Sequence, residues 1–406
     1  MAVKFAPFLP CLFLLFAACS EERLPSVARE DLFSLEIGRL EDQIDLFNIE
    51  GGRGDPVAAL AMRDGLFYIS NGNGQKIVRY TSYGDLLFMI YNEETNPLPL
   101  TLNTDPEGGG IVTRWAYTYP LREPGAIAVD SRKHIYAGDR FPYERHSYDT
   151  ENRTLLDSLV LHFDEAGRFV EYLGQEGIGG TPFSRINGLY ASMQDELAVV
   201  CRNSVGWNVY WFDPDGTLLY LVPIRNDAVP VPQDRSDAQP QVDTVMAAPD
   251  KRQLFIKVDY YRATYDESTN TRSGAEPDSS VVWIMDVETG AYADTLEVPF
   301  FETDSGQNRR QSEKLFYSML AVIRDGRVFL CVPQEGGYSL LILGKEAGQG
   351  GGLVQRRGFI QVGDDELEFN AFNVSEEGIL SGLLATEWEA KLVWWRTDRM
   401  ASELSQ

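Results

Sequence analysis

The stretch DGLFYISNGNGQKIVRYTSYGDLLFMI, Asp64 to Ile90, contains three short apolar runs separated by Asn-Gly pairs and by Tyr-Gly-Asp. Short runs rich in β-branched and aromatic residues, bounded by residues that tolerate positive φ, predict antiparallel strands joined by tight turns. The run VAALAM at residues 57–62 precedes the stretch and adds a fourth strand. The sequence here therefore predicts a four-stranded antiparallel unit, and the fold depends on whether that unit recurs.

The same cycle recurs along the chain. After a first copy near residue 56, further copies begin near residues 124, 186, 242, 316 and 368. Each combines strand-length apolar runs with turn residues, as in INGLYASMQDELAVVCRNSVGWNVYWFDPDGTLLYLV from residue 186. Six copies of such a unit indicate radial repetition. We therefore predict an all-β fold, a six-bladed β-propeller of four-stranded blades.

The two ends of the chain complement each other. The sixth copy stops after its third strand, KLVWWRT, with only DRMASELSQ remaining. Before the first copy, residues 32–49 supply strand material that belongs to no complete blade. We predict that an N-terminal strand completes the last blade and so removes an open sheet edge. The propeller would span residues 32–400, followed by a tail at 401–406; a β-sandwich gives no reason for this complementarity.

The N-terminus has the layout of a secretory signal peptide. Residues 1–18, MAVKFAPFLPCLFLLFAA, place Lys4 before an apolar run that ends in two alanines, so we expect export. The sequence FAAC, with Cys19 followed by SEER, resembles a bacterial lipobox, with Phe16 where that motif usually carries Leu, Val or Ile. The resemblance implies cleavage before Cys19, a lipid with acyl chains such as palmitate on its sulfur, and a tether at 19–31. An ordinary signal peptide cut elsewhere is the alternative.

The expected location is the cell envelope. Several acyl chains anchor a protein stably where a single chain is marginal. Ser20 stands after Cys19 in place of the aspartate that commonly retains lipoproteins at the inner membrane, which favours the outer membrane. No later segment is continuous and apolar enough to cross a bilayer, so we expect membrane contact through the acyl anchor only.

The charge balance argues against one class of partner. The chain has 61 acidic and 36 basic side chains, for a formal net charge of −25. Such a surface repels phosphate backbones and anionic headgroups. We therefore expect no nucleic-acid partner, and we interpret the acidity as a soluble surface.

Several strands resemble a known repeat. The phrases GAIAVD, HIYAGDR and LHFDEAGR in the second copy, and YWFDPDGTLL in the third, are similar to the strands of NHL-type propeller blades. The chain thus resembles bacterial lipoproteins with an NHL-like six-bladed propeller. The functions of such lipoproteins are mostly unassigned; we predict a binding or scaffolding module, with an envelope protein or a glycan as the partner. Fold alone does not define the function.

Familiar catalytic motifs are missing. The sequence has no H-E-x-x-H, no G-x-S-x-G, no P-loop and no cysteine pair with zinc spacing. The three histidines fall in the second copy, where a metal site would need further ligands. Cys201 and Cys331 lie in apolar strand-like runs, and we interpret them as buried small hydrophobes.

Polar residues precede the first strand of several blades. First strands line the channel of a propeller, so the residues before them should converge at one channel mouth; these are Glu123, Asn187, Asp243 and Asn370. Asn187 and Asp243 resemble positions by which gluconolactonase-like six-bladed hydrolases hold a divalent cation. Carboxylate and amide oxygens suit calcium or another divalent cation, which could polarise a lactone carbonyl. Solvated turns would need the same residue types.

Two long insertions carry aromatic residues suited to ordered contact. The candidate partner-binding residues are Trp115, Tyr117 and Tyr119 in the first insertion, and Phe141, Tyr143 and Tyr148 in the second. The sequence thus predicts an exported, lipid-anchored binding module that needs no cofactor. The alternative is a metal-dependent hydrolase of the lactonase type with its site at the channel mouth.

Overall fold

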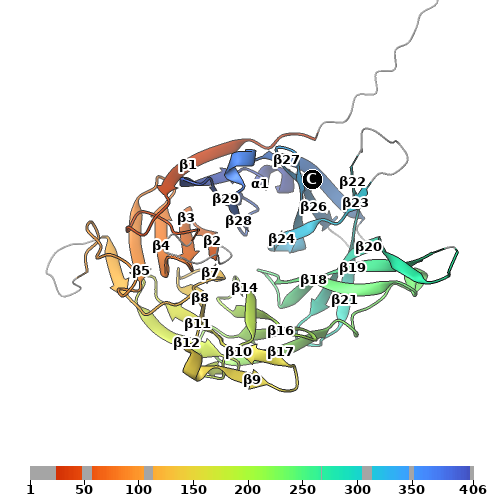
Figure 1. Ribbon diagram of the computed structural model, residues 1–406, viewed down its shortest axis with the longest axis horizontal. Coiled ribbons are helices and arrows are strands. Elements are labelled where there is room, and N and C mark those ends of the chain that lie inside the picture. The colour runs from red at the N-terminus through yellow and green to blue at the C-terminus, as the bar shows by residue number, and fades with distance from the viewer. Residues whose placement is uncertain are drawn as a thin grey trace, which may run out of the picture.

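Six β-sheets surround a central channel (Figure 1). The computed structural model describes residues 24–47, 57–104, 113–266, 268–303, 313–346 and 352–402. The predicted signal peptide and Cys19 lie outside these residues. The predicted six-bladed β-propeller is confirmed.

The blades follow one another along the chain, each running from the channel outward. Blade 1 contains β2 (Ala58–Arg63), β3 (Leu66–Asn71), β4 (Lys76–Thr81), β5 (Leu86–Tyr91) and an added β6 (Trp115–Thr118). Blade 2 contains β7 (Ile127–Val129), β8 (Ile135–Arg140), β11 (Ser158–Phe163), β12 (Phe169–Gly174) and β13 (Gly177–Ile178), with the hairpin β9 (Ser147–Asp149) and β10 (Thr154–Leu156) inserted. Blade 3 contains β14 (Arg185–Ala191), β15 (Leu197–Arg202), β16 (Gly206–Phe212) and β17 (Leu218–Arg225).

The second half of the ring is built in the same way. Blade 4 contains β18 (Gln239–Ala247), β19 (Gln253–Tyr265), β20 (Arg272–Asp286) and β21 (Tyr292–Val298). The hairpin β22 (Phe301–Thr303) and β23 (Glu313–Leu315) leads to blade 5, which contains β24 (Ser318–Val322), β25 (Val328–Gln334), β26 (Gly337–Lys345) and β27 (Leu353–Gln361). Blade 6 contains β28 (Phe369–Val374), β29 (Leu380–Ala385), β30 (Glu389–Trp395) and β1 (Arg29–Glu36), and α1 (Asp398–Ser402) follows β30.

The N-terminal strand closes the ring. β1 pairs antiparallel with β30, from Arg29 opposite Trp395 to Glu36 opposite Glu389. This pairing confirms the prediction that an N-terminal strand supplies the missing fourth strand. β1 begins at Arg29, three residues before the predicted start at 32. Two unrelated ends of the chain thus share one sheet, which removes an open edge.

Apolar packing between blades forms the core. Leu383 and Leu392 of blade 6 pack with Phe67 and Tyr80 of blade 1, and all four are at most 1% exposed. Comparable clusters lie between every other pair of adjacent blades. Each large apolar side chain buried in this way contributes roughly 1.5–3 kcal/mol. The blade interfaces therefore hold the inner strands at fixed positions around the channel.

The turns of the first blade partly follow the expected chemistry. Asp64 and Gly65 both take positive φ, of 52° and 71°, as a tight Asp-Gly hairpin requires. In the following SNGNGQK turn, by contrast, the positive φ belongs to Gln75. Gly72 is needed there because a Cβ would lie 2.8 Å from Val57 Cγ1. The Asn-Gly pairs therefore shape a longer turn.

The two cysteines of the propeller are free and buried, as predicted. Cys201 lies in β15 and Cys331 in β25, the second strands of two different blades. Burial raises the pKa of both thiols, to about 12 for Cys331. Neither thiol is activated as a nucleophile. Separately, the described residues contain no helix with the length and apolar character needed to span a bilayer.

Candidate binding site at the channel mouth

The six inner strands form a closed ring of neighbours, with β2 next to β7 and β28, and β14, β18 and β24 completing the circle. Where these strands end, the channel narrows to a cavity of about 130 Å³ lined by residues from all six blades. Arg63 bridges blades here, because it forms an ion pair of 2.8 Å with Glu376 and donates to the Val129 carbonyl at 3.1 Å. This end of the channel is the narrow end.

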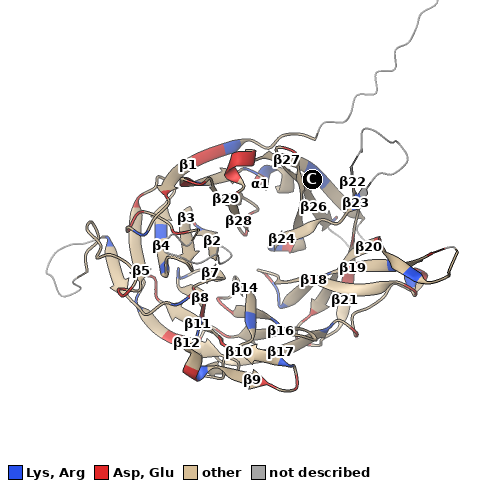
Figure 2. Ribbon diagram, viewed as in Figure 1, with Lys and Arg blue, Asp and Glu red and all other residues tan. Residues whose placement is uncertain are grey.

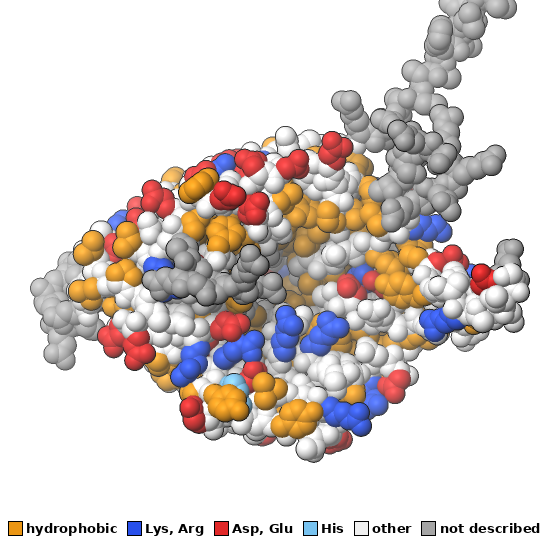
Figure 3. Space-filling model, in the orientation of Figure 1, with side chains coloured by type: hydrophobic (Ala, Val, Ile, Leu, Met, Phe, Trp, Pro, Cys, Tyr) orange, Lys and Arg blue, Asp and Glu red, His pale blue; other side chains and the backbone are white. Residues whose placement is uncertain are grey.

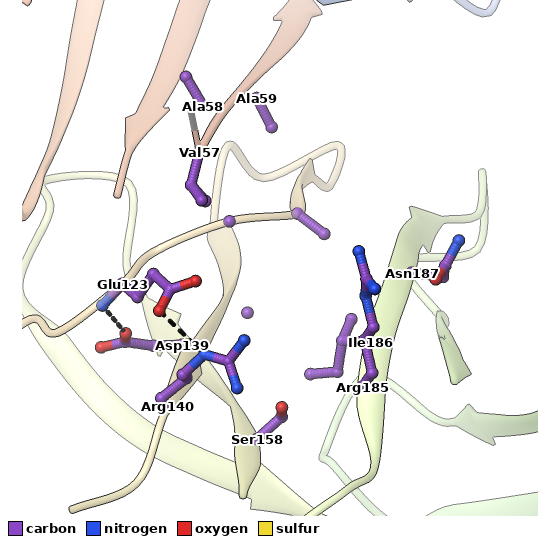
Figure 4. Close-up of a pocket in the computed structure, with 13 residues that line it drawn as sticks. Val57, Ala58, Ala59, Glu123, Asp139, Arg140, Ser158, Arg185, Ile186 and Asn187 are labelled. Atoms are coloured by element: carbon purple, nitrogen blue, oxygen red, sulfur yellow. Dashed lines mark hydrogen bonds and ion pairs between the residues drawn. The ribbon is translucent and has the colours of Figure 1, made fainter. Parts of the chain in front are cut away.

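A larger pocket of about 370 Å³ opens at the other end, where the inner strands begin. It lies between blades 1, 2 and 3 (Figure 4). The lining residues come from the start of β2, the segment before β7, the end of β8, and the starts of β11 and β14: Val57, Ala58, Ala59, Glu123, Gly125, Ala126, Gly138, Asp139, Arg140, Ser158, Arg185, Ile186 and Asn187. A pocket of this volume suits a small ligand. We call it the mouth pocket.

Glu123 lies in the mouth pocket with a cationic partner. Its carboxylate is 3.0 Å from Nε of Arg140, and Arg140 also binds Asp157 at 2.5 Å. The guanidinium of Arg140 is therefore fixed by two carboxylates. Its position is thus set before any ligand arrives, and the charge of Glu123 is compensated.

Asp139 is a pocket residue that the sequence reasoning missed. Its carboxylate accepts the backbone N–H groups of Glu123 at 2.7 Å and of Arg122 at 3.1 Å. Burial raises the pKa of Asp139 to about 6, although these backbone hydrogen bonds act in the opposite direction. Asp139 thereby holds the segment before β7 in place. The sequence does contain a clue to this role, because the aspartate of HIYAGDR is a charged residue near the end of an otherwise apolar strand.

Asn187 and Asp243 occupy matching β-bulges. Asn187 is the extra residue between Ile186 and Gly188 of β14, and Asp243 is the extra residue of β18. Four residues of the strand follow each bulge, so the two positions are equivalent in blades 3 and 4. Bulges re-aim a side chain without ending the strand. The sequence predicted the polar residues but not the bulges that present them.

Asp243 is held by a buried lysine. Nζ of Lys257 lies 3.2 Å from the Asp243 carboxylate and 2.7 Å from both oxygens of Asp259. Lys257 is 1% exposed, and Ser280 donates a further hydrogen bond to Asp259 at 2.6 Å. Burial raises the pKa of Asp259, whereas the Lys257 charge favours its ionised form. The charge of Asp243 is therefore also compensated.

The four predicted mouth residues do not share one pocket. Glu123 and Asn187 line the mouth pocket, whereas Asp243 and Asn370 are not among its lining residues. Asn370 is exposed near the start of β28, opposite Leu384. The described residues contain no group of three or more His, Cys, Asp or Glu side chains placed to hold a metal ion. Since Glu123 and Asp243 each already bind a cationic side chain, the set fits a shared divalent cation poorly.

The first aromatic insertion packs onto the ring. β6 adds in parallel to β5 at the outer edge of blade 1, and the rings of Trp115 and Tyr117 stack with centroids 6.2 Å apart. Tyr119 lies with its ring centroid 4.8 Å from that of Phe169, and burial raises its pKa to about 12. Trp115, Tyr117 and Tyr119 thus make intramolecular contacts.

The second insertion leaves two aromatic side chains exposed. Phe141 is 4% exposed and packs under the guanidinium of Arg145, 3.9 Å from the ring centroid. Tyr143 and Tyr148 are 83% and 60% exposed. These two tyrosines are thus the exposed members of the predicted set.

No family model and no curated protein matches the chain. Solved structures that resemble it include a candidate 6-phosphogluconolactonase from Bacteroides fragilis, with 12% identity, a TM-score of 0.35 and coverage of 87% of each chain. Another is the β-propeller domain of the Trilobed protease from Pyrococcus furiosus, with 10% identity, a TM-score of 0.35 and coverage of 84% of this chain and 96% of that one. Similarity at this level carries no argument about activity or ligand.

Proposed function

We propose that this chain is an exported, lipid-anchored β-propeller that acts as a binding module in the cell envelope and takes its ligand at the mouth pocket. The supporting observation is the difference between the two ends of the channel. One end narrows to about 130 Å³ and is bridged by the Arg63–Glu376 ion pair, whereas the other opens into a pocket of about 370 Å³. A rigid ring with a larger pocket at one end of its channel is suited to binding without a large conformational change.

The ligand-binding proposal is tested by filling the pocket. Asn187 is exposed on its bulge, so Asn187→Trp should occupy the mouth pocket without disturbing the core. A library of small sugars and organic acids would be screened by thermal shift against the full-length protein. We expect compounds that stabilise the native protein to lose their effect in Asn187→Trp and to keep it in a Tyr143→Ala/Tyr148→Ala double variant. If only the double variant loses binding, the insertion is the binding surface.

The anchor is tested separately. Cys19→Ser should eliminate metabolic acyl labelling and release the protein from the membrane fraction. Cys11→Ser, which changes a cysteine inside the apolar run of the signal peptide, is the matched control and should keep both. Labelling that persists in Cys19→Ser would refute lipid attachment at this residue.

The hydrolase alternative is tested with calcium. A site with a Kd near 1 mM would contribute only about 0.4 kcal/mol at 1 mM calcium. We expect no greater stabilisation, because Arg140 and Lys257 already compensate the carboxylates of Glu123 and Asp243. A clear rise in Tm that disappears in both Asp243→Ala and Asn187→Ala would favour the metal-dependent enzyme instead.

A further inference from the structure

Two arginines face each other at the start of blade 3, and one of them, Arg185, lines the mouth pocket. Arg185 begins β14 and Arg202 ends β15, and the two are direct antiparallel partners. Directly opposed residues point to the same face of a sheet, and like charges in this arrangement are destabilising. Both side chains are exposed. The start of blade 3 therefore concentrates positive charge at the channel.

Neither arginine is neutralised within the described residues. Arg185 has no ion pair or side-chain hydrogen bond there, and the contact of Arg202 is with the Trp207 ring, 5.3 Å from its centroid. The chain carries 25 more acidic than basic side chains, so carboxylate partners are plentiful. Other arginines, including Arg29, Arg132 and Arg252, form ion pairs with them. An opposed and uncompensated pair in such an acidic protein is consistent with a site for an external anion.

A third guanidinium faces the pair from blade 2. Figure 4 shows Arg140 reaching from the end of β8 toward β14, with Arg185 across the pocket. Arg140 is held by Glu123 and Asp157, so its donors are oriented in advance. Ser158 and Asn187 add neutral polar groups to the lining. The carboxylates of Glu123 and Asp139 also line the pocket, but Glu123 is paired with Arg140 and Asp139 accepts backbone N–H groups. The pocket thus offers planar cationic donors, led by Arg185, which is unpaired within the described residues, together with groups suited to hydroxyls.

The distribution of charged residues over the molecule is consistent with an anion site at the channel mouth. Figure 2 shows acidic residues along the outer strand β1 and on α1, and a basic residue on the inner strand β14. In the space-filling view, basic side chains form a row along one side of the central hollow (Figure 3). Positive charge inside a concave site raises the local concentration of anions, even on a protein of negative net charge.

We propose that the mouth pocket binds a small ligand that carries an oxyanion, either a carboxylate or a phosphate ester, through Arg185 and Arg140, which line it, with Arg202 adding positive charge beside Arg185. This inference rests on the proposed ligand-binding role of the pocket and adds its chemical class. Guanidinium groups pair bidentately with carboxylate and phosphate alike. A volume of about 370 Å³ fits a single sugar acid, sugar phosphate or organic acid, not a polymer.

Matched sugars test the proposal by calorimetry on the full-length protein at constant ionic strength. Glucuronate, glucose 6-phosphate and neutral glucose differ in the anionic group, so the first two distinguish the carboxylate from the phosphate. We expect at least one anionic sugar to bind and glucose not to. Arg185→Gln and Arg202→Gln should each weaken that binding about tenfold. The control Arg168→Gln removes an exposed arginine paired with Asp164 at the opposite end of blade 2 and should leave binding unchanged.

Three outcomes overturn the proposal. These are binding of neither anionic sugar, equal binding of glucose, and anion binding that Arg185→Gln and Arg202→Gln leave unchanged. In that case, if library compounds still bind the native protein and not Asn187→Trp, the mouth pocket remains a binding site, but for ligands of another chemical class. Loss of binding at high NaCl concentration, with glucuronate or glucose 6-phosphate, would support the electrostatic origin.

Discussion

Arg29 at the start of β1 binds Glu366, which lies in the connection between blades 5 and 6, with Nη1 2.6 Å from the carboxylate. The contact joins residues 337 positions apart and fixes the strand that closes the ring. Lys391 of β30 also approaches Glu366, at 3.2 Å. Glu366 is thus the polar centre of the closure.

Replacing Glu366 should destabilise the closure in a pH-dependent way. The hydrogen bond from Arg29 lowers the pKa of Glu366 from 4.5 to about 2, so its contribution is present above pH 4.5 and is lost as pH falls toward 2. We expect Glu366→Gln to cost about 2 kcal/mol at pH 7, measured by urea unfolding, and almost nothing near pH 2. Asp31→Asn, which removes the exposed second partner of Arg29, is the control and should cost less than about 0.5 kcal/mol. A loss of equal size at both pH values would contradict this origin.

Removing one of the two opposed arginines should stabilise the ligand-free protein. Arg185→Gln relieves the repulsion from Arg202, and we expect a gain of about 0.5 kcal/mol in the free energy of unfolding. Arg168→Gln, which loses the exposed ion pair with Asp164, should be neutral or slightly destabilising. Both changes are measured by urea unfolding at low salt, and the gain should vanish near 1 M NaCl. A destabilising Arg185→Gln would show that the arginine has an intramolecular structural role.

Removing the charge of the buried Lys257 should destabilise the protein unless the charge of its partner Asp259 is removed as well. Lys257→Met leaves the buried carboxylate of Asp259 without its cation, and we expect a cost of about 3 kcal/mol. The double variant Lys257→Met/Asp259→Leu should recover most of that loss. Lys251→Met, at an exposed lysine, is the control and should change stability little. Additive costs in the double variant would mean that the two charges do not interact.

The aromatic residues of the second insertion should separate into structural and exposed members. Phe141→Ala removes a buried ring and should cost about 3 kcal/mol in urea unfolding. Tyr143→Ala and Tyr148→Ala change exposed side chains and should each cost less than about 0.5 kcal/mol. A large cost at either tyrosine would place it in the folded core of the insertion rather than on a contact surface.

The repeated four-stranded unit made the closed ring predictable from the sequence, but it did not predict which side chains would contact one another. The incomplete sixth copy and the surplus before the first predicted the pairing of β1 with β30, because an unpaired strand edge needs a partner. The bulges at Asn187 and Asp243 depend on the local register between neighbouring strands, which apolar alternation does not define. The contact between Asp243 and Lys257 and the facing pair Arg185 and Arg202 depend on that same register. These features determine the charge of the site, and they become visible only in the folded sheet.

The chain approaches the ring along its circumference. Before β1 begins, Val27 donates its N–H to the Phe359 carbonyl, and Phe359 donates to the Pro25 carbonyl, so residues 25–27 border β27 on the outer edge of blade 5. An anchor at Cys19 would be separated from this contact by a few residues, a reach of roughly 20 Å. A ring with such an anchor would be attached at its outer edge and not at either end of its channel. With such an anchor, neither opening of the channel would need to face the bilayer, and the proposed ligand could reach the mouth pocket from solution.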